Sequence, residues 1–306
     1  MTVDILHPFP AERGFGKRMS ALMEGLGATR RVRWRRRWAE LPAVLVMPRD
    51  RDDHQVLFYH SLLAPLLVLL RLLRPGLRLR YMVRGDEILE ARLKGRPWRA
   101  RAARFCQALL ARLGVRFIFV SWDLEALFQE RYPALTRHCV LPNTLGKPLP
   151  PTRAFDGRIG LVGGSVMKNL DWALDELAPT EWEIHVFGRA AGEASPSRRI
   201  EHGVVEDLVG ELGRHCSLVV VCSLSEGFPN VLVEALEAGC AVLLQDAFPF
   251  ARFPLAEAWR FPLRDGGLRE RLASLSREPR DFARDNRALL DLLGQDWQGL
   301  LEQALA

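Results

Sequence analysis

Two carboxylates, Glu226 and Glu234, stand with seven residues between them in one apolar stretch of the sequence. Residues 218–222 before them predict a buried strand, and Pro229 predicts the first position of the helix that follows. A helix that begins at the carboxyl end of a parallel strand presents unpaired backbone N–H groups and a positive dipole end, which suits a diphosphate. Carboxylates beside an anion are unfavourable unless they accept hydrogen bonds from neutral hydroxyl groups. The pattern therefore indicates a site for a diphosphate that carries hydroxyl groups.

The candidate diphosphate contacts lie in the loop after Glu226 and in the first turn of the helix. They are Gly227, Phe228, Pro229, Asn230 and Val231. Periodicity alone leaves a plainer interpretation open, because on a helix Glu234 shares a face with Asn230 and Glu237. That face lies opposite the apolar positions, so Glu234 fits a solvated helix face as well as a binding site.

Short apolar strands alternate with helical patterns along the chain, which is typical of βαβ units and parallel sheets. In the first half we expect strands at residues 3–7, 43–47, 56–59, 77–83, 116–120 and 138–141, with helices near 17–26, 61–73, 88–112 and 122–131. In the second half we expect strands at 158–162, 183–187, 199–204, 218–222 and 241–245, helices near 170–177, 205–214 and 229–238, and a helical end beyond Pro262. Residues 141–151 contain four prolines and predict a linker. The sequence thus predicts an α/β protein with domains at residues 1–150 and 151–306.

Residues 223–246, SLSEGFPNVLVEALEAGCAVLLQD, resemble the E-x7-E motif of retaining GT-B glycosyltransferases of family 4. The resemblance implies two Rossmann-like domains, whose parallel sheets face each other across a cleft. It implies that Glu226 is a catalytic residue near the donor sugar and that Glu234 binds the ribose hydroxyls of the nucleotide. It also implies that the backbone N–H groups after Glu226 bind the diphosphate.

Two more glycine-containing segments resemble the same family. In RIGLVGGSVMKNLDWALDEL, residues 158–177, Lys168 matches a Lys that grips the diphosphate and is a further candidate catalytic residue. Gly164 or Ser165 occupies the place of the family's phosphate-binding Arg, and both are candidate donor contacts. Gly14 and Gly16 stand where the family's glycine loop approaches the donor phosphates, although a plain helix-start turn fits them equally well.

The segment RLRYMVRGDE, residues 78–87, stands where the family usually has a His that faces the donor sugar. Arg84 is a candidate catalytic residue here, because its charge could stabilise the leaving diphosphate. Asp86 is a candidate contact for acceptor or sugar hydroxyls. A buried structural ion pair is the alternative for both residues.

The resemblance implies transfer of a sugar from a nucleoside diphosphate sugar, with UDP favoured, to a hydroxyl acceptor with retention. The acceptor class is a glycan or a lipid-linked molecule of bacterial polysaccharide or glycoconjugate synthesis. No metal ion or other cofactor is expected, and the seven His residues show no HxxH spacing of a zinc site. Two other functions stay open: a sugar-nucleotide epimerase of similar fold, and a degenerate, non-catalytic donor-binding subunit.

The charge is divided unevenly between the halves. Residues 1–150 hold 27 Lys and Arg against 13 Asp and Glu, whereas residues 151–306 hold 16 against 24. The basic, Trp-containing residues 33–38 and the Leu-rich residues 62–73 together predict peripheral contact with an anionic membrane. The alternative is a core helix beside a solvated basic edge. Nucleic acid is not an expected partner, since no binding motif accompanies the charge.

The cysteines and the N-terminus bear on the compartment. Five dispersed Cys without a CxxC pair predict free thiols in a reducing cytoplasm. The N-terminus shows no secretory signal, and the longest apolar stretch, residues 62–70, is too short to span a bilayer. We therefore expect a cytoplasmic protein at the inner face of the cytoplasmic membrane.

Overall fold

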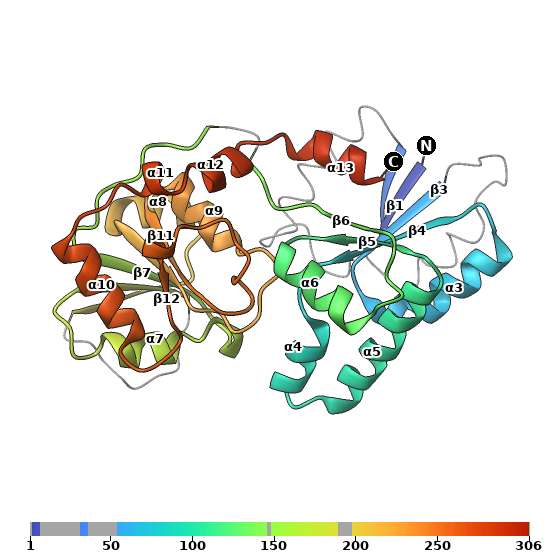
Figure 1. Ribbon diagram of the computed structural model, residues 1–306, viewed down its shortest axis with the longest axis horizontal. Helices are drawn as coiled ribbons and strands as arrows, with labels where there is room; N and C mark the ends of the chain where they lie inside the picture. The colour runs from blue at the N-terminus through green and yellow to red at the C-terminus, as the bar shows by residue number, and fades with distance from the viewer. Residues whose placement is uncertain (1, 7–30, 36–53, 146–147, 189–197, 306) are drawn as a thin grey trace. The chain divides into compact units, whose positions relative to one another are not determined.

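The structure is a computed structural model that describes residues 2–6, 31–35, 54–145, 148–188 and 198–305. The chain forms two compact units. The first unit contains Met1–Pro142 and Trp297–Ala306, and the second contains Asn143–Asp296. Each unit is an α/β structure built on its own six-stranded sheet (Figure 1).

The boundary between the units differs from the expected division at residue 150, and the second unit does not run to residue 306. The last helix, α13 (Trp297–Leu305), belongs to the first unit. The backbone carbonyl of Leu305 accepts hydrogen bonds from Gln55 Nε2 at 2.9 Å and from Arg80 Nη2 at 3.2 Å. Both side chains are buried, so the end of α13 satisfies polar groups that the first sheet could not leave unpaired.

The first unit has a parallel sheet in the order β2-β1-β3-β4-β5-β6. Its strands are β1 (Thr2–Leu6), β2 (Arg31–Arg35), β3 (His54–Phe58), β4 (Arg78–Val83), β5 (Arg116–Phe119) and β6 (His138–Val140). Its helices before α13 are η2 (Ser61–Leu63), α3 (Ala64–Leu73), α4 (Glu87–Leu93), α5 (Pro97–Arg112) and α6 (Trp122–Arg131). Aromatic rings in stacked and edge-to-face contacts lie in its core: Phe58, Tyr81, Phe117, Phe119 and Phe128.

The second unit has a parallel sheet in the order β12-β11-β10-β7-β8-β9, which is the strand order of a Rossmann fold. Its strands are β7 (Arg158–Gly163), β8 (Glu183–Gly188), β9 (Arg199–Gly203), β10 (Leu218–Val221), β11 (Ala241–Gln245) and β12 (Arg260–Phe261). The central strands β10 and β11 are buried throughout, as expected for a sheet covered on both faces.

Helices cover both faces of the second sheet, with α7 and α10 on one face and α8 and α9 on the other (Figure 1). The helical elements are η3 (Val166–Lys168), α7 (Leu170–Leu177), α8 (Leu208–His215), α9 (Asn230–Glu237), η4 (Glu257–Trp259), α10 (Gly267–Arg277), α11 (Phe282–Asp285) and α12 (Arg287–Leu293). Five neighbouring apolar residues of α9 are buried: Val231, Leu232, Val233, Ala235 and Leu236. This apolar face holds α9 on the sheet.

Several expected elements of the first half differ from the structure. The basic residues 31–35 form β2, which no apolar run predicted, because pairing with β1 gives this segment its strand geometry. The expected helix 88–112 is two helices, α4 and α5, since Gly95 between them has a left-handed φ of 65°. The expected strand 43–47 and helix 17–26 lie outside the described residues.

Candidate functional site

The two loops that carry Lys168 and Glu226 follow neighbouring strands of the second sheet. Strand β7 pairs with β10, and this pair is where the strand order reverses direction. Helices after the two strands therefore leave on opposite faces of the sheet. Ligands of open α/β sheets bind at such a point.

Lys168 and Glu226 form an ion pair between Nζ and Oε1. The Lys168 side chain is 28% exposed and the Glu226 side chain 15%, so water screens this pair only partly. Ser223 Oγ donates a second hydrogen bond to the same Oε1 at 3.0 Å. The carboxylate is thus held in one orientation by a cation and a hydroxyl. The sequence analysis did not single out Ser223, which lies three residues before Glu226 in the same loop.

Backbone contacts fix the two loops to each other. Leu224 N donates to the carbonyl of Met167 at 2.8 Å. Cys222 Sγ contacts the carbonyls of Lys168 and Asn169 at 3.2 and 3.4 Å. Burial raises the pKa of the Cys222 thiol to about 12, so this sulfur remains a protonated donor. These contacts therefore hold the loops of Lys168 and Glu226 together.

Glycines at the carboxyl ends of β7 and β8 allow the backbone and Lys168 to approach closely. A Cβ on Gly163 would lie 2.6 Å from Cγ and 2.7 Å from Cβ of Lys168. A Cβ on Gly188 would lie 1.8 Å from the carbonyl oxygen of Gly163, and Gly188 has a φ of 111°. Only glycine fits either position without a shift of the backbone.

Helix α9 begins at Asn230, one residue later than expected, and Pro229 is its N-cap in an extended conformation. The Pro229 side chain makes no capping hydrogen bond, and the first turn contains no acidic residue. None of the described residues accepts a hydrogen bond from the backbone N–H groups of Gly227, Phe228 or Val231. These donors at a helix start form an arrangement that binds anions.

The same loop contains another polar group without a protein partner. Ser225 Oγ is buried and has no hydrogen bond to any described residue. Buried hydroxyls are nearly always paired, so an unpaired one beside Glu226 fits a loop that completes its contacts with a ligand.

The side chains of the candidate loop residues divide into two kinds. The ring of Phe228 is buried against Phe253, with ring centroids 5.0 Å apart, and the side chain of Val231 is buried as well. These two residues can offer a ligand only their backbone. Asn230 Oδ1 accepts a hydrogen bond from Asn143 Nδ2 at 3.1 Å, which ties the start of α9 to the start of the second unit. Glu234 is half-buried on α9, one turn further along.

Of the remaining candidates, Gly164 and Ser165 are exposed in the turn between β7 and η3, open to a ligand. Gly14 and Gly16 lie outside the described residues. Arg84 follows β4 in the first unit and is half-buried. It lies close enough to the buried Tyr59 for its charge to oppose the rise that burial causes in the pKa of that phenol.

Asp86 is part of a structural ion pair, the alternative that the sequence left open. Its carboxylate accepts two hydrogen bonds from the Arg131 guanidinium, at 2.9 and 2.8 Å, and it is 3% exposed. Oδ1 also accepts from Ile88 N at 3.1 Å and so caps α4. With its oxygens used in this way, Asp86 is not a hydroxyl contact. Its partner Arg131 is 45 positions further along the sequence, so no local pattern pointed to it.

The five cysteines are free thiols, as expected. Among the described helices, none combines the length and the apolar character needed to cross a membrane.

Comparison with known proteins agrees with the fold. Residues 156–252 match the family model described as glycosyl transferases group 1. A search of curated protein sequences found no match. The matched residues include both Lys168 and the loop of Glu226.

Solved structures extend the similarity to the whole chain. A sucrose-phosphate synthase from Thermosynechococcus elongatus superposes with a TM-score of 0.77 at 13% identity, over 99% of this chain and 96% of that one. WaaG, a glycosyltransferase involved in lipopolysaccharide biosynthesis, gives a TM-score of 0.64 at 18% identity, over 100% and 98%. A trehalose-6-phosphate protein from E. coli bound with UDP-2-fluoro glucose gives 0.68 at 12% identity, over 100% and 99%. At these identities the likeness concerns the fold. The chain has the GT-B fold of two Rossmann-like units, and its residues 156–252 are similar to the glycosyl transferases of group 1.

Proposed function

We propose that this chain transfers a sugar from a nucleoside diphosphate sugar, UDP-sugar in first place, to a hydroxyl acceptor with retention at the anomeric carbon. The observation that carries the proposal is the ion pair of Lys168 and Glu226 at the junction of β7 and β10, near the backbone N–H groups of Gly227, Phe228 and Val231, which donate to none of the described residues. A cation, backbone donors and a carboxylate are the groups that a sugar diphosphate needs.

Lys168 and the α9 N-terminus would hold the diphosphate. In the ion pair, Glu226 neutralises the Lys168 ammonium, so a bound diphosphate would become a second anionic partner of the same cation. The N–H groups of Gly227 and Val231 and the dipole of α9 would stabilise the negative charge that grows on the leaving phosphate. Gly164 and Ser165 would border this pocket from the β7 side.

Glu226 and Glu234 would bind the neutral parts of the donor. A carboxylate accepts hydrogen bonds, so Glu226 suits the hydroxyls of the sugar, and Glu234, one turn into α9, suits the ribose hydroxyls. In the transfer, the bond between the anomeric carbon and the phosphate oxygen breaks, and a bond to the acceptor oxygen forms on the same face. The acceptor proton passes to the leaving phosphate, so the reaction needs no protein nucleophile, metal ion or other cofactor. Arg84, Gly14 and Gly16 are proposed donor contacts from the first unit.

The first unit would bind the acceptor, a glycan or a lipid-linked molecule, at the cytoplasmic face of an anionic membrane. Helix α3 buries Leu67 and Leu70 but leaves Leu69 and Leu72 52% and 74% exposed, so it is only partly a core helix. Helix α5, which packs on α3, exposes Trp98 among arginines. Apolar anchors between basic residues favour the headgroup region of anionic lipid. The role that fits is bacterial polysaccharide or glycoconjugate synthesis.

Donor binding and turnover of matched variants test the proposal. Isothermal titration with UDP and GDP measures donor affinity, and acceptor-dependent release of nucleotide measures turnover. Loss of a charge-assisted hydrogen bond costs about 1.5–3 kcal/mol, so Lys168→Met should weaken UDP binding by roughly 10- to 100-fold. Glu226→Gln should keep UDP binding but lower turnover by roughly 100-fold or more. Glu237→Gln, at the end of α9, is the control and should match the unaltered protein.

The outcomes separate the proposal from the two other functions. Nucleotide release or an isomerised sugar without any acceptor would identify an epimerase-like enzyme. Nucleotide binding without turnover for every donor and acceptor would identify a donor-binding subunit. Full activity of both Lys168→Met and Glu226→Gln would overturn the assignment of the site itself.

A further inference from the structure

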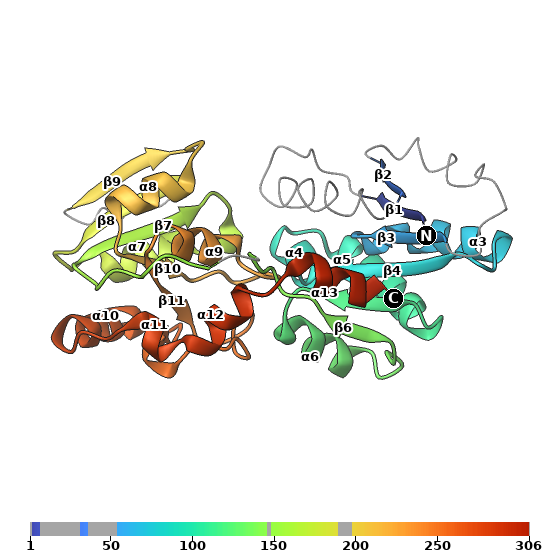
Figure 2. The same cartoon turned by 90° about the horizontal axis from the view of Figure 1, so that it is seen from above.

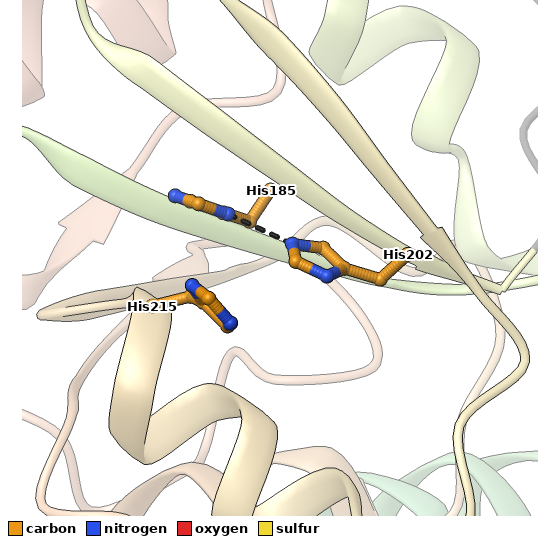
Figure 3. A group of neighbouring side chains, drawn as sticks. All are labelled: His185, His202 and His215. Carbon is orange, nitrogen blue, oxygen red and sulfur yellow. Dashed lines mark hydrogen bonds between the residues drawn. The ribbon is translucent and has the colours of Figure 1, made fainter.

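Three histidines from three elements of the second unit meet at one place. His185 lies in β8, His202 in β9, and His215 is the last residue of α8. Each ring offers one nitrogen to a common centre, and these three atoms all lie within 4.8 Å of one another (Figure 3). Imidazole nitrogens are among the preferred ligands of zinc and related transition metals.

The fold brings this cluster together through an irregularity of the edge strand. Along β8 and β9, Val186 pairs with Glu201 but Phe187 pairs with Gly203, so His202 is the extra residue of a β-bulge. A bulge can re-aim a side chain. Here the His202 ring stacks on Phe187, with centroids 4.4 Å apart, and its Nε2 lies 2.9 Å from His185 Nδ1.

The three rings are packed closely enough for small movements to complete a metal site. The ring centroids of His185 and His215 are 5.2 Å apart, and those of His202 and His215 are 4.8 Å apart. Zn–N bonds of about 2.0–2.1 Å in a tetrahedral site hold two nitrogens about 3.3–3.4 Å apart. The His185–His202 contact would therefore open by about half an ångström, and the half-exposed His215 would turn towards it.

A carboxylate lies near one ring nitrogen of His185 and of His215, and metal-binding histidines often donate their second N–H to such a group. Glu183 Oε1 lies 2.7 Å from His185 Nε2, so Nε2–H can donate to it and Nδ1 is left as the ligand atom. Glu211 Oε2 lies 3.4 Å from His215 Nε2.

We propose that His185, His202 and His215 bind a divalent transition-metal ion, Zn²⁺ in first place, with water as a further ligand. The ion fastens the edge strand β9 and the end of α8 to β8 and so stabilises the second unit. It takes no part in sugar transfer, because Lys168 and Glu226 lie at the carboxyl ends of β7 and β10. The expectation of no zinc site rested on short spacings, whereas this cluster joins residues 17 and 13 positions apart.

Metal titration of the tag-free, full-length chain after removal of metal by EDTA tests the proposal. We expect about one Zn²⁺ per chain by calorimetry and by elemental analysis after gel filtration, with a rise in the thermal midpoint. His202→Gln and His215→Gln should each weaken binding by roughly 100-fold, and Glu183→Gln by roughly 10- to 100-fold. His138→Gln, in the first unit, is the matched control and should bind like the unaltered chain.

A second measurement needs no variant. Co²⁺ bound by three imidazoles gives visible absorption bands of a four- or five-coordinate site, which six-coordinate aqueous Co²⁺ lacks. Those bands, displaced by one equivalent of Zn²⁺, would support the proposal. An unaltered chain that binds no more Zn²⁺ than the His202→Gln, His215→Gln double variant, or that gives only the spectrum of aqueous Co²⁺, would overturn it and leave the cluster as an aromatic stack.

Discussion

Replacement of Gly163 by alanine would disturb the candidate donor site through packing alone. The added methyl group would lie 2.6 Å from Lys168 Cγ and 2.7 Å from Lys168 Cβ. Carbon atoms in contact are about 3.5–4.0 Å apart, so Lys168 must retreat by about 1 Å. Because Cβ moves with the backbone, a change of rotamer cannot relieve both contacts, and η3 itself must shift.

This displacement should lower both the free energy of unfolding and the turnover. Overpacking in a tight region costs about 1–3 kcal/mol of stability, and Gly163 is not among the glycines with positive φ, so backbone strain adds nothing. A displacement of about 1 Å in a catalytic group can lower turnover by about 100-fold. Gly163→Ala should therefore lose about 1–3 kcal/mol of unfolding free energy and most of its turnover.

Urea unfolding, UDP titration and acceptor-dependent nucleotide release are the assays. Gly294→Ala is the matched control in the same unit, since its Cβ would meet its nearest atoms at ordinary distances of 3.5 and 3.6 Å. The double variant Gly163→Ala, Lys168→Gly removes the clashing Cβ and Cγ atoms and should recover stability, although not turnover. The reasoning is refuted if Gly163→Ala behaves like Gly294→Ala, or if the double variant is no more stable than Gly163→Ala.

Two other predictions concern the first unit. Asp86→Asn keeps an acceptor for the cap of α4 but breaks the ion pair with Arg131. Urea unfolding should therefore show that the free energy of unfolding falls by about 3 kcal/mol. The affinity for UDP should not change. A stability equal to that of the unaltered chain would contradict the structural role of Asp86. The protein should sediment with vesicles that contain phosphatidylglycerol, and the double variant Leu69→Ser, Leu72→Ser should bind them at least about tenfold more weakly. Equal binding of the variant, or no binding by either protein, would argue against membrane contact through α3.

The sequence predicted the second unit better than the first because two of its strands, β10 and β11, are almost continuous apolar runs. Residues 218–221 and 241–245 are buried throughout, and such runs between helices leave few alternatives to a parallel sheet. Strand β2 has arginines at alternate positions, so its sequence predicts a surface segment, and only its pairing with β1 makes it a strand. The return of α13 to the first unit depends on hydrogen bonds from Gln55 and Arg80, which are more than 200 residues away.

The sequence predicted those parts of the candidate site whose residues are neighbours in the chain. Glu226, Pro229 and the helix after them form one continuous segment, and its pattern predicted the loop and the helix start to within one residue. The pairing of Lys168 with Glu226 across 58 residues depends on strand order, which periodicity does not contain. Asp86 could be interpreted as a hydroxyl contact because its partner Arg131, 45 positions further along the chain, is not apparent from local sequence.

Strand β7 separates the two features of the second unit that bear on its chemistry. On one side it pairs with β10, whose loop carries Glu226, and on the other with β8, which carries His185 (Figure 2). A metal ion at the histidines could also act on the loop of Glu226 through α8, which ends at His215, leads into β10 and packs on α9. If His202→Gln lost Zn²⁺ and kept UDP binding, the ion would be structural. If it lost both and stayed folded by circular dichroism, the two sites would be coupled, and the assignment of a purely structural ion would be wrong.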